Sequence, residues 1–230
     1  MSDPAAVVFS FGYVVVVLAV AELIRKNLEL KKDFTRKFVH IAIGTFIIPT
    51  FYIFHSLYYA LVPPVCFIIV NVLSYRFKIF RAMEEEDGKN LGTMLFPVSF
   101  CIVMIVFWNT KYEPDRVAAM LGILTMAWGD SAASIIGRNF GTHFYYFFRE
   151  RKSIEGSIAM LVASYTAMII TLALVGYPRL SVPGMVIVAV VTAIFGTFLE
   201  AISVRGLDNL IVPVLSSGVA FLTIKLLSHF

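Results

Sequence analysis

The chain has 230 residues, of which 59% are hydrophobic and 15% are charged, and its mean hydropathy is +0.85. A soluble protein holds roughly 45–50% apolar and about 25% charged residues, so this composition excludes an ordinary soluble domain and predicts lipid as the main solvent. The net charge of +4 does not require a nucleic-acid partner, because lysine and arginine also mark one side of a membrane protein.

Apolar runs long enough to cross a bilayer follow one another along the whole chain. They predict an all-α, polytopic integral membrane protein, with residues 1–230 forming a single transmembrane domain of about eight transmembrane or re-entrant helices. Only His55 and Ser56 separate the second run from the third, so a re-entrant pair and seven spans are the alternative. The eight runs cover residues 5–24, 38–54, 57–75, 91–108, 117–137, 158–176, 182–202 and 210–227.

The basic residues are divided unevenly between the two sets of alternate connections. Fifteen of the nineteen lysines and arginines lie in the connections that follow the first, third, fifth and seventh runs, whereas the other connections hold three. By the positive-inside rule the rich side is cytoplasmic and the N-terminus lies outside. We therefore expect the plasma or inner membrane of a prokaryote, with the functional face toward the cytoplasm.

Four charged residues fall inside the runs, where each is costly and is a functional candidate. Glu22, Glu200 and Lys225 lie near the ends of runs, where a shallow position would tolerate them. Asp130 lies deeper. In the same run Asp130, Ser134 and Arg138 recur at i, i+4 and i+8 and predict one polar stripe on a helix. We expect Asp130 to handle a metal or a phosphate. A protonated, structural aspartate is the alternative.

Basic side chains also gather at the start of the second run. Arg36 lies one helical turn before His40, beside Lys37. Cations at the start of a helix oppose the helix dipole, so an anionic ligand nearby would explain their position. A purely structural His40 is the alternative.

The segment 149–157, RERKSIEGS, joins a charge cluster to the sixth run. Ser153 is a plausible N-cap with Glu155 in the first turn, and Lys152 beside that helix start could hold a phosphate oxygen. Asp208 and Asn209 before the last run likewise predict an N-cap pair.

These polar residues lie in or just beneath the connections expected on the cytoplasmic side. Carboxylates mixed with lysine and arginine favour metal-assisted phosphoryl transfer, because the acids bind Mg²⁺ and the cations neutralise phosphate charge. The chain contains no GxxxxGK[ST] phosphate loop, no protein-kinase signature and no HExxH motif. Any nucleotide chemistry must therefore use a membrane-specific scaffold.

Five motifs in order resemble the polytopic polyprenol kinase family, which includes phytol, dolichol, farnesol and CTP-dependent diacylglycerol kinases. The resemblance covers about residues 36–215 and implies transfer of the γ-phosphoryl group, typically from CTP with a divalent cation such as Mg²⁺, to a long-chain lipid alcohol. The motifs are RKFVHIAIG at 36–44, NLGTMLFP at 90–97, WGDSAASIIGRNFG at 128–141, KSIEGSIAM at 152–160 and EAISVRGLDNLIVPVL at 200–215.

The resemblance also implies roles for individual residues. Asp130 would be the central metal ligand. Glu155 or Asp208 would share the metal, and Glu200 is a further candidate. Either Asp208 or His40 would take the alcohol proton. The residues expected to bind phosphate or base are Arg36, Lys37, Asn90, Ser134, Arg138, Lys152 and Asn209, and the expected catalytic residues are Asp130, Asp208, His40 and Glu155.

Two alternatives and one hypothesis complete the prediction. The stretch GDSAASIIGRNFG also resembles CDP-diacylglycerol synthases (phosphatidate cytidylyltransferases), but their later GHGGxxDRxD signature has no counterpart at residues 206–210. A membrane transporter would show ionisable residues near the bilayer midplane and internal repeats, neither of which is clear here. For the kinase, a lateral opening for the lipid, lined by Phe46, Phe100 and Phe195, is a hypothesis.

Overall fold

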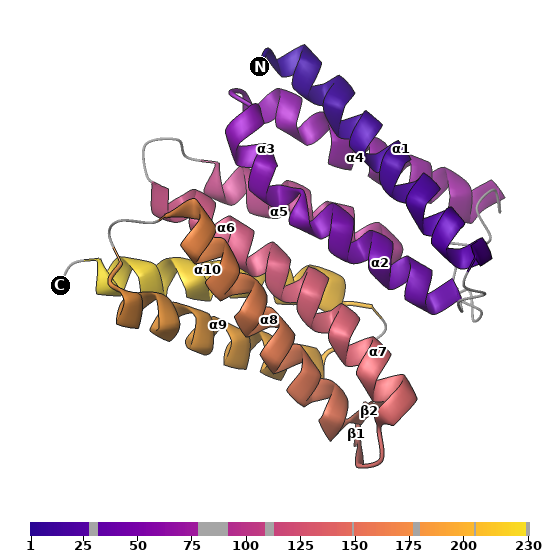
Figure 1. Cartoon of the computed structure of the whole chain (residues 1–230), viewed down its shortest axis with the longest axis vertical. Helices are drawn as coiled ribbons and strands as arrows, with labels where there is room; N and C mark the ends of the chain where they lie inside the picture. The colour runs from indigo at the N-terminus through magenta and orange to yellow at the C-terminus, as the bar shows by residue number, and fades with distance from the viewer. Residues whose placement is uncertain are drawn as a thin grey trace.

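The structure is a computed structural model that describes residues 1–27, 32–77, 92–108, 113–148, 150–176, 180–204 and 206–228. Helices make up nearly all of this part of the chain, and a short β-hairpin interrupts them (Figure 1). The helices are α1 (Asp3–Asn27), α2 (Lys32–Thr45), α3 (Ile47–Ile53), α4 (Leu57–Phe77), α5 (Gly92–Phe107), α6 (Glu113–Leu124), the π-helix η1 (Thr125–Asp130), α7 (Ser131–Phe140), α8 (Ile154–Val175), α9 (Val182–Ile202) and α10 (Asp208–Leu227).

The described helices confirm a polytopic membrane protein. Five segments are long and apolar enough to cross a bilayer, namely α1, α8, α9, α10 and the continuous stretch Asp115–Phe140 that joins α6, η1 and α7. Shorter apolar helices cover Leu57–Leu73 and Met94–Phe107. Each of the eight predicted apolar runs is helical over most of its length.

The second predicted run is two helices and not one span. α2 ends at Thr45 and α3 begins at Ile47, and the short turn after α3 leads directly into α4. Pro49 explains the break, because it has no N–H to donate to the carbonyl of Thr45, four residues earlier, and its ring would clash with that carbonyl. The Phe46 amide instead bonds back to the carbonyls of Ala42 and Ile43.

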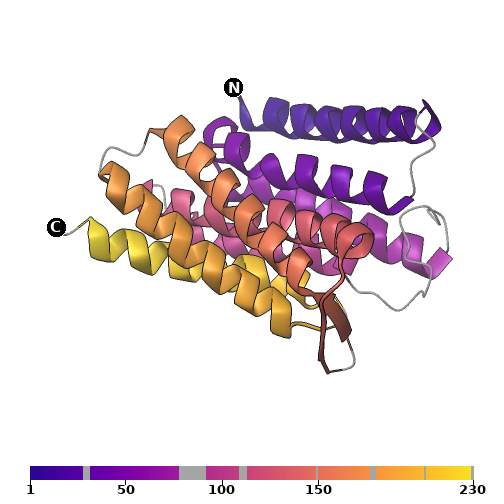
Figure 2. The same cartoon turned by 60° about the horizontal axis from the view of Figure 1, so that its bottom comes forward.

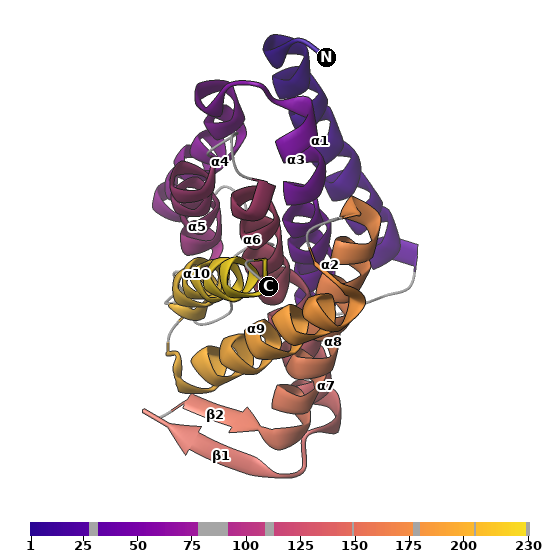
Figure 3. The ribbon, with the colours of Figure 1, turned by 90° about the vertical axis from the view of Figure 1, so that its left-hand side faces the viewer.

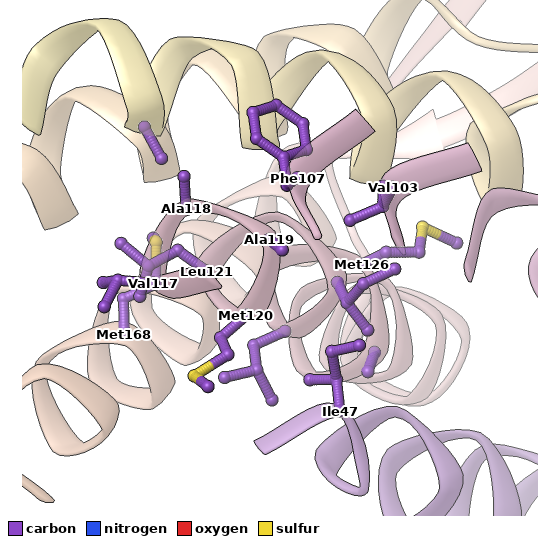
Figure 4. Close-up of a cluster of buried hydrophobic side chains, with 14 of the residues drawn as sticks. Ile47, Val103, Phe107, Val117, Ala118, Ala119, Met120, Leu121, Met126 and Met168 are labelled. Atoms are coloured by element: carbon purple, nitrogen blue, oxygen red, sulfur yellow. The ribbon is translucent and has the colours of Figure 1, made fainter. Parts of the chain in front are cut away.

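The helix α6 runs through the middle of the bundle. Of the most apolar window in Asp115–Phe140, 72% is buried, against 17% for α1. α6 packs against α10, α5, α8 and η1, and side chains on all its faces, including Ala118, Ala119 and Leu121, are fully buried (Figure 4). A helix that is apolar all round belongs in the centre of a bundle. It therefore forms the rigid support on which η1 and α7 continue.

The β-hairpin between α7 and α8 was not predicted, because this segment was expected only to connect two helices. Strand β1 (Phe144–Phe147) pairs antiparallel with β2 (Glu150–Ser153), with Phe144 opposite Ser153 and Tyr146 opposite Arg151. The aromatic run FYYF has high β-propensity, which was the signal in the sequence. Figures 2 and 3 place the hairpin on the opposite side of the molecule from α1.

The start of α8 confirms one predicted cap, and the start of α10 contradicts the other. Ser153 is the N-cap of α8, and its hydroxyl accepts a hydrogen bond from the Gly156 amide at 3.1 Å. In contrast, the N-cap position of α10 is Leu207, without a side-chain bond, and Asp208 lies in the first turn. The Asp208 carboxylate is therefore not used as a cap.

Candidate active site

A polar cavity of about 460 Å³ lies where α2, η1, α7, the hairpin, and the adjoining ends of α8, α9 and α10 meet. Segments from both halves of the chain therefore build one site. It contains nearly all of the described residues that the sequence singled out. The predicted residues that line it are Arg36, Lys37, His40, Asp130, Ser134, Arg138, Lys152, Glu200, Asp208 and Asn209.

Two buried ion pairs lie in the wall of this cavity. The Lys37 ammonium on α2 donates to the Asp130 carboxylate at the end of η1, 93 residues away. The Lys152 ammonium on β2 donates to the Glu200 carboxylate on α9 at 2.5 Å, and also to the Glu200 backbone carbonyl. Asp130 and Glu200 are each only 8% exposed. A buried carboxylate without a cation is strongly destabilising, so each lysine stabilises the acid that it contacts.

The predicted polar stripe forms one side of the cavity. η1 is π-helical and ends at Asp130, after which α7 continues as a regular α-helix carrying Ser134 and Arg138. Single π-helical turns are frequent at functional sites, because the wider turn re-aims the side chains that follow it. The three residues line the same cavity, as their spacing predicts.

Asp33 is a rim residue that the sequence analysis missed. Its carboxylate accepts from the Arg36 guanidinium at 3.0 Å and is also paired with the Arg138 guanidinium. It therefore ties α2 to α7 and orients two of the predicted phosphate-binding arginines. An aspartate in a charged loop next to a helix start carries no distinguishing pattern in one sequence.

Asp208 and Asn209 enter the cavity from the first turn of α10. The Asp208 carboxylate accepts from both the backbone amide of Asn209, at 2.9 Å, and its side-chain amide, at 3.1 Å. These bonds fix the orientation of the carboxylate and leave its second oxygen for other partners.

The structure does not bring Glu155 into this group. The Glu155 carboxylate accepts from the Thr142 hydroxyl at 2.7 Å and from the His143 backbone amide at 3.1 Å, and Glu155 does not line the polar cavity. Asn90 lies outside the described residues, although its neighbour Gly92 lines the cavity.

Small residues bring α7 and α8 close together beneath the cavity. A Cβ on Gly137 would lie 2.9 Å from the Ser153 hydroxyl oxygen, and one on Gly156 would lie 2.9 Å from the carbonyl oxygen of Ala133. Both distances are too short for a real Cβ. These glycines therefore allow the N-terminus of α8 to sit beside the polar stripe.

A second, apolar cavity of about 240 Å³ lies between α1, α2, α3, α4 and α5. Phe46 and Phe100, two of the three aromatic residues expected at a lipid opening, line it, whereas Phe195 on α9 does not. The Tyr13 hydroxyl donates to the Ala42 carbonyl at 2.8 Å and so ties α1 to α2 across this cavity.

The two cavities share Arg36 and His40 in their walls. The His40 imidazole stacks on Phe96, with ring centroids 3.8 Å apart. Its Nε2 atom is buried and has no hydrogen-bond partner among the residues that the structure describes. Buried polar atoms are nearly always paired, so an imidazole nitrogen left open between a polar and an apolar cavity is suited to a ligand hydroxyl.

The cytidylyltransferase family matches residues 2–201, most of the chain. The chain belongs to this family. Its relatives include a phytol kinase of Synechocystis sp., which is 31% identical over 216 residues, 94% of this chain and 90% of the relative. No solved structure matches the chain.

Two yeast relatives match this member of the cytidylyltransferase family over shorter stretches. A CTP-dependent diacylglycerol kinase of Schizosaccharomyces pombe is 28% identical over a stretch that covers 63% of this chain and 66% of the kinase. A dolichol kinase of the same organism is 30% identical and covers 56% of this chain and 25% of its own. All three names describe kinases of lipid alcohols.

The acidic residues of the polar cavity fit a magnesium nucleotide better than a metal held by protein alone. No group of three or more His, Cys, Asp or Glu side chains suited to a metal occurs in the described part of the chain. Mg²⁺ commonly takes one or two carboxylates, with water and substrate phosphates as its other ligands. Asp130 and Asp208 are hard oxygen donors in one cavity with lysines, and this is the donor set that such a site needs.

Proposed function

We propose that this protein is a lipid-alcohol kinase that transfers the γ-phosphoryl group of CTP to an isoprenoid-type alcohol. The observation that carries the proposal is the pair of cavities of opposite polarity that share Arg36 and His40. A kinase of this kind must bring the terminal phosphate of a highly charged donor next to the hydroxyl of an apolar acceptor. The names of the relatives, phytol kinase and dolichol kinase, support the same reaction.

The polar cavity is the proposed donor site. Lys37, Lys152 and Arg36 would neutralise the charge on the phosphates as it shifts during transfer. Asp130 and Asp208 would hold a divalent cation, with Glu200 lining the same cavity, and the cation would supply positive charge that stabilises the phosphates during transfer. Ser134, Arg138 and Asn209 would orient the nucleotide along α7.

The two lysines have a second task in this scheme. Each lysine donates to a carboxylate that would otherwise be buried and unpaired. A triphosphate with its cation brings both charges to the site, so the lysines can turn to phosphate oxygens while the acids keep a positive partner. Nucleotide binding then leaves no charge without a partner, which keeps the cost of desolvation low.

The apolar cavity is the proposed acceptor site. Its walls are mostly apolar, with Phe46, Phe67 and Phe100 among them, and suit a hydrocarbon chain. The hydroxyl of the alcohol would lie at the wall shared with the polar cavity, where His40 Nε2 has no hydrogen-bond partner among the described residues. We propose His40 as the group that accepts the alcohol proton. His40 lines both cavities, whereas Asp208 lines the polar cavity and not the apolar one.

The kinase proposal has one specific rival within the family. The family is described as cytidylyltransferases, and a CDP-lipid synthase would use CTP in the same cavity but transfer the cytidylyl group. Incubating the purified protein with both phytol and phosphatidic acid, and with CTP labelled at either the γ or the α phosphorus, separates the two reactions. We expect the label to reach the lipid from the γ position. Transfer from the α position alone would overturn the kinase.

The expected cytoplasmic orientation of the polar cavity has its own test. Tyr146 in the hairpin is 70% exposed and Ser181 caps the start of α9. Cysteine at position 146 should be shielded from a membrane-impermeant maleimide in intact cells and labelled after lysis, whereas cysteine at position 181 should be labelled in both. The reverse pattern would place the donor site outside.

A further inference from the structure

We propose that the β-hairpin is the nucleobase subsite of the polar cavity, with the Phe144 ring stacking against the base and Arg151 donating to its edge. This inference rests on the proposed function for the direction in which the nucleotide lies. It assigns a binding role to two residues that the sequence motifs did not include.

The direction follows from the position of the shared wall. The acceptor hydroxyl must meet the γ-phosphate, and the two cavities share Arg36 and His40. The γ-phosphate therefore lies at the end of the polar cavity next to α2, where Lys37 contacts Asp130. The nucleoside must then point away from α2 toward the other end.

The length of the cavity along α7 is sufficient for a nucleotide. Asp130 and Gly141, at the two ends of α7, both line it. Gly141 lies eleven positions after Asp130, which corresponds to about 16 Å at the α-helical rise per residue. This is comparable with an extended nucleoside triphosphate, so a base would lie beyond Gly141, where the hairpin begins.

Phe144 lies at this far end and has the right chemistry. Among the described residues that line the polar cavity it is the only one with a benzene ring, and it is 42% exposed. An aromatic face that is partly exposed in the cavity is available for stacking, and base stacking on such a face is favourable for every base.

Arg151 is held beside that ring. Phe144 and Tyr146 face Ser153 and Arg151 in the antiparallel register, so these side chains share one face of the hairpin. The Arg151 guanidinium carbon lies 4.1 Å from the centroid of Phe144, a cation–π contact that keeps both side chains at the cavity before a nucleotide arrives.

The base of the hairpin is anchored on α8. The Ile154 amide donates to the His143 carbonyl at 2.9 Å, and Glu155 accepts from Thr142 and His143. Glu155, which the motifs singled out as a metal ligand, therefore lies where it would position the hairpin.

Phe144 and Arg151 together could also distinguish one nucleobase from another. A guanidinium only donates, and cytosine presents two adjacent acceptors, O2 and N3, on its pairing edge. Adenine presents an acceptor beside an amino donor there, which a guanidinium cannot match. We therefore infer that Arg151 favours a cytosine nucleotide over an adenine nucleotide, while Phe144 adds affinity for either.

The test compares Phe144→Ala with Phe144→Trp and with Tyr146→Ala as a matched control. Tyr146 lies on the same face of the hairpin and is outside the cavity lining. Titration of CTP into the purified protein should show binding weakened about tenfold to a hundredfold by F144A, and unchanged by Y146A. F144W should keep the parent affinity, which separates loss of stacking from loss of the hairpin. Equal CTP affinity in F144A and the parent would overturn the proposal.

Arg151→Ala tests the choice of base. The ratio of kcat/KM for CTP to that for ATP should fall about tenfold, the size expected for losing one bidentate contact to a base edge. Light-induced crosslinking with 5-iodo-CTP should label the peptide that contains Phe144, and exclusive labelling elsewhere in the chain would refute the assignment.

The outcomes distinguish this inference from the proposed function. If the parent protein phosphorylates phytol and F144A binds CTP normally, the subsite is wrong and the kinase stands. If CTP labels the hairpin but only the α-phosphorus reaches a lipid, the subsite stands and the kinase is wrong.

Discussion

The polar and apolar cavities that share Arg36 and His40 are built from different kinds of sequence. The polar cavity draws its residues from α2 through to α10, and most of them are charged or polar in a chain that is 59% hydrophobic. The apolar cavity uses only α1 to α5, and most of its residues resemble those that face lipid elsewhere. In this membrane protein the candidate catalytic residues can be recognised in the sequence, because charged residues are rare there. A binding site for a hydrocarbon chain cannot be recognised in this way, because its residues resemble those that face lipid.

Substitution of His40, in the wall that the two cavities share, should give the largest loss of activity. His40→Gln keeps a polar side chain but removes the basic nitrogen, so we expect kcat to fall about 10²–10⁴-fold, with CTP affinity retained. Initial rates with phytol and direct CTP titration measure the two quantities. If H40Q remains within threefold of the parent in kcat, His40 is not the base.

Asp130→Asn should affect the polar cavity alone. Removing the charge eliminates a proposed cation ligand and leaves Lys37 without its carboxylate partner, so we expect phosphoryl transfer to fall about 10²–10³-fold. Asp33→Asn, the same change at the rim, should cost less than tenfold because Asp33 only orients Arg36 and Arg138. Comparable rates for D130N and the parent protein would remove Asp130 from the donor site.

Ala60→Phe should affect the apolar cavity alone. Ala60 lines it and is 1% exposed, so a phenyl group would occupy space proposed for the lipid. We expect KM for phytol to rise about tenfold with KM for CTP unchanged, since a few carbon atoms in an apolar pocket change specificity by this amount. Ala19→Phe on the exposed face of α1 is the control. A larger change in KM for CTP than for phytol would contradict the assignment of the two cavities.

The smallest expected effect comes from the two helix caps, Ser153 and Ser181. Both stabilise a helix, but only Ser153 also lines the polar cavity. Ser153 and Ser181 both cap helices through a hydrogen bond from the amide three residues ahead. Alanine at either position should lower stability by about 1 kcal/mol in thermal unfolding. Only S153A should also weaken CTP binding, because Ser153 lines the polar cavity and Ser181 does not. Equal CTP affinity in the two variants would show that the cap has no local role.

Local patterns predicted some features correctly for clear reasons. The apolar runs predicted the helices correctly, because a helix that crosses a bilayer needs a long uninterrupted hydrophobic segment. Ser153 was predicted correctly as a cap because capping depends on four consecutive residues, here Ser153 to Gly156. The stripe of Asp130, Ser134 and Arg138 was found because helical periodicity places them on one face.

Other features depended on distant partners. The pairing of Lys37 with Asp130 spans 93 residues, and nothing in either segment specifies the other. The resemblance implied that Glu155 or Asp208 shares the metal, and in the structure the Glu155 carboxylate accepts hydrogen bonds from Thr142 and His143, which lie 13 and 12 residues earlier. The hairpin was overlooked because the connection was interpreted by charge and not by its aromatic run.

The sequence by itself determined that this is a helical membrane protein and which rare polar residues to examine, since burying charge in lipid is costly enough to be visible in composition. Only the tertiary structure decided that Arg36 and His40 lie between two cavities, because that depends on how α2 packs against α5 and η1. The break at Pro49 was present in the sequence, but its consequence for the fold was not.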